Sequence, residues 1–211
     1  VEQLLLHKDL DKHKAKSISI DMLNRVGIAD AEKRFNQYAF ELSGGMRQRA
    51  MIAMALSTMP KLLLADEPTT ALDVTIQAQV INLMKDIIKE FNMGVIFITH
   101  DLGVIAQVAD DVAVMYLGSV VERGPVNEIL KNPKHPYTKG LLNALPDINN
   151  LDAPLKPIPG NIPSPLERPT GCVFRTRCPN PTHDCKEGNI EMGLIEVEPG
   201  HWVDQCCVNC G

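Results

Sequence analysis

This sequence of 211 residues lacks any apolar run long enough to cross a membrane. Its longest apolar stretches, such as residues 49–56 and 94–99, fall well short of the roughly 18 uninterrupted apolar residues that a membrane-spanning helix needs. It also lacks a positively charged start followed by an apolar run and a small-residue cleavage site, which argues against secretion. We therefore expect a cytoplasmic protein that reaches a membrane only through a partner.

An excess of positive charge is also lacking. The sequence holds 21 Lys and Arg against 26 Asp and Glu, a formal net charge of -5. This balance gives no broad electrostatic attraction to nucleic acid or to anionic lipid, so a phosphate ligand would need a local site. Hydrophobic residues make up 45% of the chain, enough for one sizeable domain or for one domain with a small appendage.

Cysteine is absent from the first 171 residues, and all six cysteines fall between Cys172 and Cys210. Such clustering indicates one local site and argues against a disulfide framework spread over the chain. The first three are too far apart for the C-x-x-C pattern of a zinc knuckle, so a fourth ligand would come from near the end. Four thiolates suit zinc or an iron–sulfur cluster, and reduced cysteines without metal are the third alternative. The candidates are Cys172, Cys178 and Cys185, with Cys206, Cys207 or Cys210 as the fourth.

Helix and strand patterns alternate through the first 122 residues. Apolar residues at four-residue spacing before Gly27 predict an amphipathic helix, and Ser43 is a good N-cap for a second helix that Pro60 ends. Short apolar runs that end in polar residues are typical of buried parallel strands. We expect helices over 14–26, 46–59, 73 to the stop at Gly94, and 102–108, with strands over 61–65, 94–99, 112–117 and 119–122. This order predicts an α/β fold with a parallel sheet covered by helices, in which ligands bind at the carboxyl ends of the strands.

Proline is concentrated in one segment, with seven prolines between Pro146 and Pro169. This composition predicts a linker or an extended segment that wraps around the protein. Residues 171–211 then carry all the cysteines and too few apolar residues for a core of their own. A metal or a disulfide would compensate for that shortage.

The step Ser43-Gly44-Gly45-Met46 leads into the second predicted helix. Unpaired backbone N–H groups and the helix dipole make such a step suitable for an anion, and glycine lets a phosphate approach the backbone closely. A plain turn with a helix cap is the more common meaning of this pattern. The neighbouring motifs therefore decide its interpretation.

Two carboxylates and a histidine follow predicted strands. Asp66 and Glu67 end the strand over 61–65, and His100 follows the strand over 94–99. Two acids buried at a strand end are costly, but they are tolerable if they serve a metal and a reaction. Asp66 would then face Mg²⁺, directly or through water, and Glu67 would polarise the water that attacks a phosphoryl group. His100 would hydrogen-bond the terminal phosphate. The alternatives are a strand-end turn capped by Asp66 and a surface His100.

These motifs, in this order, resemble those of ABC ATPases. LSGGMRQ at 42–48 resembles the signature, and LLLADEP at 62–68 resembles the Walker B strand with its catalytic glutamate. Residues 71–73 look like the D-loop, and His100 looks like the switch histidine. The resemblance implies a P-loop NTPase-like fold that uses ATP and Mg²⁺.

The resemblance also implies how two subunits cooperate. In ABC ATPases the signature of one subunit closes over the ATP held by the other, so Ser43, Gly44, Gly45 and Met46 would bind nucleotide in trans. Asp73 would lie at the interface of the two ATPase subunits.

One expected motif is missing, because the sequence contains no G-x-x-x-x-G-K-[ST] phosphate loop. The chain also starts with Val1, within a helical pattern. We therefore expect an N-terminally truncated ABC ATPase core that lacks its first strands and is inactive alone. The expected organisation is a partial ABC ATPase domain over 1–130 and an extension over 131–211. Within the first, a helical subdomain would reach about residue 60, and the Walker B and switch-histidine part would cover 61–130.

The tail resembles that of oligopeptide and dipeptide importer subunits. NPKHPYTKGLL at 132–142 and PIPGNIPS at 157–164 resemble the segment after their ATPase core, and GCVFRTRCPNPTHDC at 171–185 matches their cysteine cluster. Some family members are thought to hold a four-iron cluster there, which favours iron–sulfur over zinc. Family tails place the last cysteine where Gln205 stands here, which leaves the fourth ligand open between Cys206 and its neighbours.

The resemblance implies an ATP-hydrolysing subunit that energises peptide import. Nickel import is the alternative, because nickel-importing relatives share this tail. The implied partners are a second ABC ATPase subunit, two transmembrane permease subunits and, indirectly, an extracytoplasmic peptide-binding protein, with no nucleic acid. The implied location is peripheral, on the cytoplasmic face of a bacterial or archaeal membrane.

Two other classes of function compete with transport. A DNA-repair or chromosome-associated ATPase would need a coiled coil or a zinc insertion between its motifs, and the interval 46–66 is too short for either. A non-catalytic metal-binding fragment is consistent with the missing phosphate loop.

Overall fold

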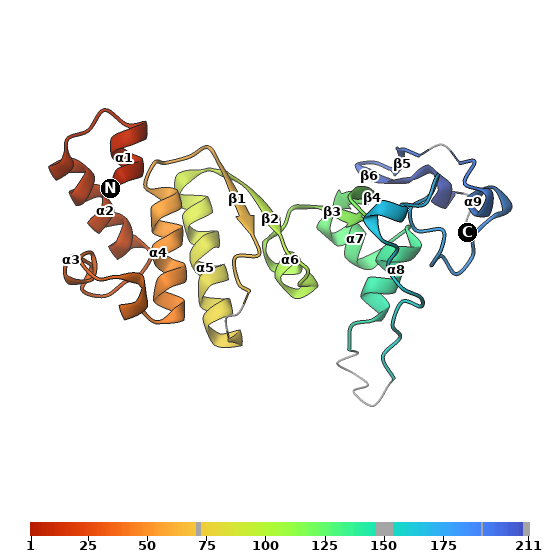
Figure 1. Cartoon of the computed structure of the whole chain (residues 1–211), viewed down its shortest axis with the longest axis horizontal. Helices are drawn as coiled ribbons and strands as arrows, with labels where there is room; N and C mark the ends of the chain where they lie inside the picture. Colours follow the sequence, from red (N-terminus) through yellow and green to blue (C-terminus); the bar gives the residue numbers. More distant parts are fainter. Residues whose placement is uncertain (71–72, 147–153, 191, 209–211) are drawn as a thin grey trace. The chain divides into compact units, whose positions relative to one another are not determined.

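The computed structural model describes residues 1–70, 73–146, 154–190 and 192–208. The chain divides into two compact units, Val1–Val104 and Ile105–Gly211 (Figure 1). Among the described residues, no helix combines the length and the apolar character that crossing a membrane requires.

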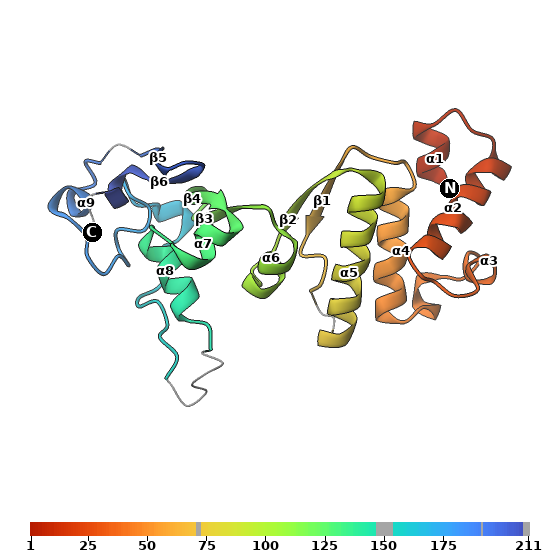
Figure 2. The ribbon, with the colours of Figure 1, turned by 180° about the vertical axis from the view of Figure 1, so that it is seen from behind.

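The first unit packs helices against one face of a two-stranded sheet (Figures 1 and 2). Its elements in chain order are α1 (Glu2–His7), α2 (Lys12–Arg25), α3 (Ala31–Arg34), the 3₁₀ turn η1 (Ala39–Glu41), α4 (Gly44–Leu56), β1 (Leu62–Asp66), α5 (Val74–Phe91), β2 (Gly94–Ile98) and α6 (Leu102–Val108), whose last turns belong to the second unit.

Side-chain caps start the three long helices of this unit. Asp11 accepts a hydrogen bond from the Lys14 N–H at 2.8 Å, and Ser43 accepts one from the Met46 N–H at 3.3 Å. Asp73 caps α5 in the same way. The predicted helix starts at Ser43 and Asp73 are confirmed, because their oxygens satisfy donors that the first helical turn leaves unpaired.

The predicted end of the third long helix is wrong by about two residues. α5 ends at Phe91, and Asn92 takes up the left-handed conformation with φ of 46°, so the helix stops before Gly94. Asparagine tolerates this conformation well and commonly ends helices. Gly94 instead begins β2.

The two predicted strands at the centre of the chain pair in parallel, from Leu62 opposite Gly94 to Asp66 opposite Ile98. One face of this sheet packs on the core of α2, α4 and α5 through Leu63, Ala65, Val95 and Phe97. The other face is exposed, with 53% of Leu62, 66% of Leu64, 48% of Ile96 and 50% of Ile98 accessible to solvent. The predicted burial of these strands on both faces is therefore wrong for the described residues.

The second unit is built on a four-stranded antiparallel sheet of order β3-β4-β6-β5. Its elements are β3 (Asp111–Tyr116), β4 (Ser119–Pro125), α7 (Val126–Lys131), α8 (Pro136–Asn143), η2 (Pro165–Glu167), α9 (His183–Glu187), β5 (Leu194–Glu198), β6 (His201–Asp204) and η3 (Gln205–Val208). The predicted strands over 112–117 and 119–122 exist, but they do not join the parallel sheet. A turn of two residues, Leu117 and Gly118, links them, and such a turn permits only antiparallel pairing.

The tail shares its core with the β3–β4 hairpin. β6 pairs with β4 at Glu122 opposite Val203, so segments about 80 residues apart become neighbours. For this reason the two units divide after Val104, whereas the organisation expected from the sequence divides at residue 130. That expected division stays a prediction about the ATPase domain and its extension.

Phe174 lies at the centre of this second core and is 1% exposed. Its ring contacts Tyr116 edge-on at 5.2 Å between centroids, and it lies 5.5 Å from Tyr137 and 5.6 Å from His135. The aromatic contacts join the hairpin, the start of α8 and the cysteine segment. A tail with few apolar residues is thus stabilised by residues that precede it.

Phe174→Ala should lower the free energy of unfolding of the second unit by about 3–5 kcal/mol, because it leaves a cavity among ordered aromatic rings. Urea unfolding followed by circular dichroism measures this change. Phe40→Ala removes a ring that is 81% exposed and should change stability by less than about 0.5 kcal/mol. Equal losses in the two variants would contradict a central role for Phe174.

Candidate functional site

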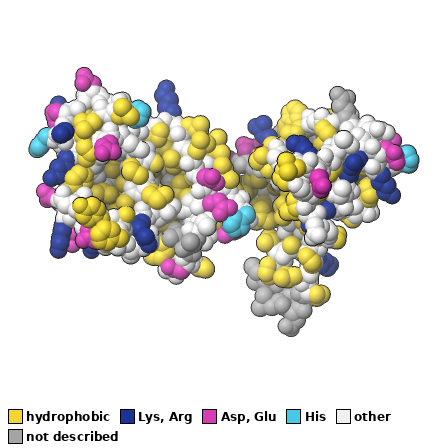
Figure 3. Space-filling model, in the orientation of Figure 1, with side chains coloured by type: hydrophobic (Ala, Val, Ile, Leu, Met, Phe, Trp, Pro, Cys, Tyr) yellow, Lys and Arg dark blue, Asp and Glu magenta, His cyan; other side chains and the backbone are white. Residues whose placement is uncertain are grey.

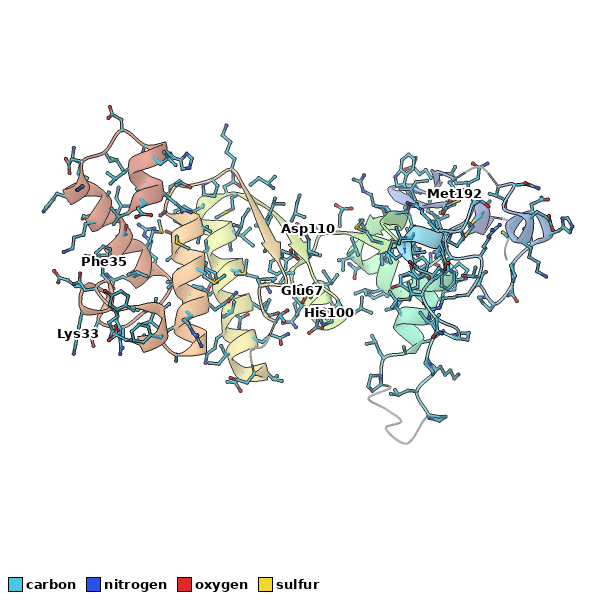
Figure 4. The ribbon with its side chains drawn as sticks, viewed as in Figure 1. Lys33, Phe35, Glu67, His100, Asp110 and Met192 are labelled. Carbon is cyan, nitrogen blue, oxygen red and sulfur yellow. The ribbon has the colours of Figure 1, made fainter. Side chains whose placement is uncertain are left out.

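Glu67 and His100 meet at the carboxyl ends of β1 and β2 (Figure 4). Glu67 Oε1 lies 2.8 Å from His100 Nδ1, and Thr70 Oγ1 donates to the other carboxylate oxygen at 2.5 Å. The Glu67 N–H donates to the Ile98 carbonyl at 2.8 Å. The parallel sheet thereby brings together two residues that the sequence placed at separate strand ends.

The two side chains shift each other's pKa. The Thr70 hydrogen bond, followed by that of His100, lowers the pKa of Glu67, and the bond to Glu67 raises the pKa of His100. Glu67 is therefore ionised at neutral pH, as a group that orients or deprotonates water must be. Solvent screens the pair, because 80% of the His100 side chain and 41% of the Glu67 side chain are exposed.

The backbone at Glu67 is held in an uncommon conformation. Its φ of 44° lies in the left-handed region, which a glutamate adopts at a cost on the order of 1 kcal/mol. The Thr70 N–H donates to the Glu67 carbonyl at 3.1 Å, which closes a tight turn directly after β1. This turn and the bonds to Ile98 and His100 offset the local strain and fix where the carboxylate lies.

The carboxylates are exposed, which corrects the expectation that two buried acids stand at this strand end. Asp66 and Glu67 are both exposed to solvent. The physical reason is the uncovered face of the β1–β2 sheet, where hydrophobic side chains reach the surface of the first unit (Figure 3). An exposed Asp66 is open to a hydrated cation, and its role toward Mg²⁺ stays a prediction.

The signature segment forms the N-terminus of α4. Ser43 and Gly44 are exposed, and a Cβ at Gly44 would meet no atom within 4 Å. At Gly45 a Cβ would lie 3.1 Å from Ile76 Cγ2 at the start of α5, so this glycine permits close helix packing. Glycine is thus needed at the two positions for different reasons. Gly45 permits close packing of α4 on α5, whereas Gly44 leaves its backbone open to a ligand.

Gln48, the last residue of the signature-like motif, and Asp101 make contacts that the sequence patterns did not predict. The Gln48 side chain donates to the Pro68 carbonyl and so ties α4 to the turn after Glu67. Asp101 accepts from Gln77 at 2.9 Å and from the Gly103 N–H at 2.8 Å. An Asp before a predicted helix is an N-cap signal that would have found the second residue. Of the segment resembling the D-loop, only Asp73 is described, and residues 71–72 lie outside the described part.

The cysteines form a second candidate site, in the core of the second unit. None of the five described cysteines is in a disulfide, and Cys210 lies outside the described residues. The exposed fractions are 3% for Cys172, 2% for Cys185 and 4% for Cys206, and Cys178 and Cys207 pack against the same core. The structure thus gathers all the described candidate ligands.

Two further residues, His135 and Asp204, belong to this site. One ring nitrogen of His135, the Cys172 and Cys206 sulfurs and one Asp204 oxygen all lie within 4.8 Å of one another. The segment containing His135 was noticed in the sequence, but as a family resemblance and not as part of a metal site. Only the pairing of β6 with β4 and the shared core reveal this neighbourhood.

The surroundings of Cys172 and Cys178 disfavour the thiolate form in the absence of a cation. The hydrogen bond to Cys206, together with burial, raises the pKa of Cys172, and burial raises that of Cys178. A bound cation would favour thiolates that otherwise crowd each other in an apolar core, and it would release their protons. The donor set therefore fits a thiophilic metal.

A buried carboxylate anchors the segment next to this site. Glu122 and His201 are both 0% exposed, and His201 Nε2 lies 2.8 Å from Glu122 Oε1. The backbone N–H groups of Lys134 and His135 donate to the same carboxylate at 2.6 and 3.1 Å. These bonds satisfy a carboxyl group that would otherwise be costly to bury, and they hold residues 134–135 against β4 and β6.

A glutamate and a histidine at adjacent parallel strand ends, together with a helix that follows Ser43-Gly44-Gly45, form the arrangement expected of an ABC-type ATPase. The comparisons agree. Residues 2–70 match the family described as ABC transporter, and residues 121–185 match the oligopeptide/dipeptide transporter C-terminal region. The chain belongs to the ATP-binding proteins of the oligopeptide/dipeptide ABC transporter family.

Individual relatives cover most of the chain. It is 50% identical over 184 residues to the oligopeptide transport ATP-binding protein AppD of Bacillus subtilis, which is 87% of this chain and 56% of AppD. It is 50% identical over 200 residues to the oligopeptide transport ATP-binding protein OppD of Salmonella typhimurium, 95% of this chain and 59% of OppD. The chain thus spans less than two thirds of the length of these relatives.

A solved structure described as a metal-chelate type ABC transporter in an inward-facing conformation is also similar. It matches 60% of this chain and 48% of its own chain, with a TM-score of 0.51 and 29% identity. The predicted membership of the ABC ATPases and the predicted peptide-importer subfamily are confirmed.

Glu67→Gln should bring the pKa of His100 down toward its ordinary value, because Glu67 supplies the main stabilisation of the imidazolium. In the unchanged protein the ion pair is present below the raised pKa and is lost as pH rises through it. Titration of the His100 ring signals by NMR measures the shift. Asp101 raises the His100 pKa less than Glu67 does, so Asp101→Asn should lower that pKa much less. A His100 pKa unchanged by Glu67→Gln would contradict the pair in solution.

Proposed function

We propose that the chain serves in an ATP-binding and ATP-hydrolysing subunit that energises peptide import by an ABC transporter. The observation that carries this proposal is the Glu67–His100 pair at the ends of β1 and β2, 2.8 Å apart. Membership of the ABC transporter family supports ATP and Mg²⁺ as ligands. The names of the relatives, oligopeptide transport ATP-binding proteins, favour peptide over nickel as the cargo.

In this proposal each strand-end residue has one task. Ionised Glu67 accepts a proton from the attacking water, while Thr70 and His100 hold its carboxylate in place. With the His100 Nδ1–H donating to Glu67, the Nε2 atom carries the second proton of the imidazolium form and can then donate to a terminal phosphate. Exposed Asp66 would bind Mg²⁺, directly or through water.

The partners follow from the same proposal. Ser43, Gly44, Gly45 and Met46 would contact the ATP of a second ABC ATPase subunit, and the Asp73 region would face that subunit. Two transmembrane permease subunits would hold the pair at the cytoplasmic face of the membrane, and a peptide-binding protein would deliver cargo from the other side. The 211 residues contain no phosphate-loop motif, so we propose that they do not hydrolyse ATP alone.

We further propose that the tail holds a metal centre bound by Cys172, Cys178, Cys185 and Cys206, a four-iron cluster with zinc as the alternative. Three of these residues are buried, and all of them share one core without disulfides. Cys207 Sγ lies 3.4 Å from Cys206 Sγ and is the alternative fourth ligand. When bound, such a cluster supplies one-electron chemistry and also crosslinks the segment that carries its ligands.

In the assembled transporter, Glu67→Gln should retain ATP binding but reduce hydrolysis at its site by at least about 100-fold, because an amide cannot act as the base. Phosphate release measures turnover, after the partner's site has been disabled. Glu90→Gln makes the same change at an exposed residue that pairs with Arg25, and it should leave turnover unchanged. Near-normal turnover in Glu67→Gln would remove Glu67 from this role.

Anaerobically prepared protein should be brown and hold iron and acid-labile sulfide in equal amounts. Cys178→Ser should bleach it and expose the tail to protease, whereas Cys207→Ser should keep the colour if Cys206 is the fourth ligand. Absorption spectra, metal analysis and limited proteolysis measure these outcomes. Colourless protein with one zinc per chain would support the zinc alternative, and metal-free protein with a resistant tail would contradict both.

A further inference from the structure

The ring of His135 is held in one orientation by its surroundings. His135 is the N-cap of α8, and its Nδ1 accepts a hydrogen bond from the Tyr137 N–H at 3.0 Å. Its backbone N–H donates to Glu122 Oε2 at 3.1 Å, and its ring lies against Phe174. His135 is 0% exposed, so water does not compete for these positions.

These contacts determine where the ring proton lies. A neutral imidazole has one N–H, and an imidazolium has two donors and no acceptor. Since Nδ1 accepts from Tyr137, the ring is neutral and its proton is on Nε2. Nε2 is buried, and within the described part of the chain it has no hydrogen-bond partner. A buried donor without an acceptor is unfavourable, which indicates that an acceptor is missing from this place.

Three acceptors lie near the ring, the Cys172 and Cys206 sulfurs and one Asp204 oxygen. Asp204 already accepts from the Gly193 N–H at 3.5 Å, so the sulfurs are the acceptors that the proposal uses. A ring nitrogen of His135, Cys172 Sγ and Cys206 Sγ lie within 4.8 Å of one another. Because Nε2 carries the proton, it cannot bind a metal while the Tyr137 bond exists. It can donate to a sulfur that a metal holds as thiolate, and such donors next to metal ligands tune the metal.

We propose that the His135 Nε2–H donates a hydrogen bond to a metal-bound thiolate of Cys172 or Cys206 and thereby raises the reduction potential of the tail cluster. This inference rests on the iron–sulfur centre proposed above. Charge on the sulfurs is more negative after reduction, so a donor stabilises the reduced form more than the oxidised form. His135 is in this sense a positioning and tuning residue and not a cluster ligand.

Two substitutions separate the tuning role from the structural one. In His135→Asn, the amide oxygen can replace Nδ1 as the helix cap, but nothing replaces the Nε2–H. In His135→Gln, the longer side chain can place an amide N–H near the Nε2 position, but the cap for the Tyr137 N–H is lost. If His135 is only structural, His135→Gln should lose stability and His135→Asn should resemble the unchanged protein. If His135 tunes the cluster, His135→Asn should change the reduction potential.

The test is a redox titration of the 211-residue chain with its cluster, followed by electron paramagnetic resonance, together with iron analysis and thermal melting. His135→Asn should keep its iron and Tm, but its ratio of reduced to oxidised cluster at a fixed potential should fall about tenfold, equal to about 60 mV for one electron. His135→Gln should keep a potential close to that of the unchanged protein, with a lower Tm.

Each result decides between distinct conclusions. An unchanged potential in iron-loaded His135→Asn would overturn this inference and leave the cluster standing. Loss of iron from a folded His135→Asn would also overturn it, since His135 would then act as a ligand. If His135→Asn does not fold, a lowered potential in His135→Gln overturns it and a retained one supports it. Unchanged protein that is colourless would contradict the cluster proposal itself, and this inference with it.

Discussion

The parallel pairing of β1 with β2 is the interaction on which the geometry of the Glu67–His100 site depends. Its register places Asp66 opposite Ile98, so the turn at Glu67 and the residue His100 emerge at the same edge. The packing of one sheet face on α4 and α5 fixes the sheet, and Gln48 connects the signature helix to the turn after Glu67. A shift of register would separate the carboxylate from the imidazole, because neither side chain is held by burial.

A buried carboxyl group plays the corresponding part in the second unit. Glu122 on β4 collects bonds from His201 on β6 and from the backbone of residues 134–135. Because a carboxyl group in a core needs hydrogen-bond partners for both oxygens, this residue favours a structure in which β4, β6 and the start of α8 meet. The cysteine site lies in the core that this arrangement encloses, and His135 belongs to both the network and the site.

The two sites differ in how far a sequence can describe them. Asp66, Glu67 and His100 follow short apolar runs, so their place at strand ends was predictable from local patterns, and so were the caps Ser43 and Asp73. For the cysteine site, the sequence predicted which cysteines are candidate ligands but not the other residues that lie beside them. His135 and Asp204 stand 37 and 32 residues from Cys172 along the chain, with no spacing rule to connect them. The predicted strand pairing was wrong for a similar reason. Periodicity shows that residues 112–117 form a strand, but it does not show which strand they pair with.

The sequence by itself determined four of the helices (α2, α4, α5 and α6), the strands β1 to β4, the helix starts at Ser43 and Asp73, the motif residues and the resemblance to ABC ATPases of the peptide-importer type. These are local properties, since hydrophobic period, capping and short motifs act over a few residues. Only the tertiary structure decided the separate antiparallel sheet, the exposure of the strand-end acids and the Glu67–His100 bond. It alone also placed His135 beside two cysteines. These properties depend on pairings between distant segments and on which faces are covered, and such contacts are set by packing and by the need to satisfy buried polar groups.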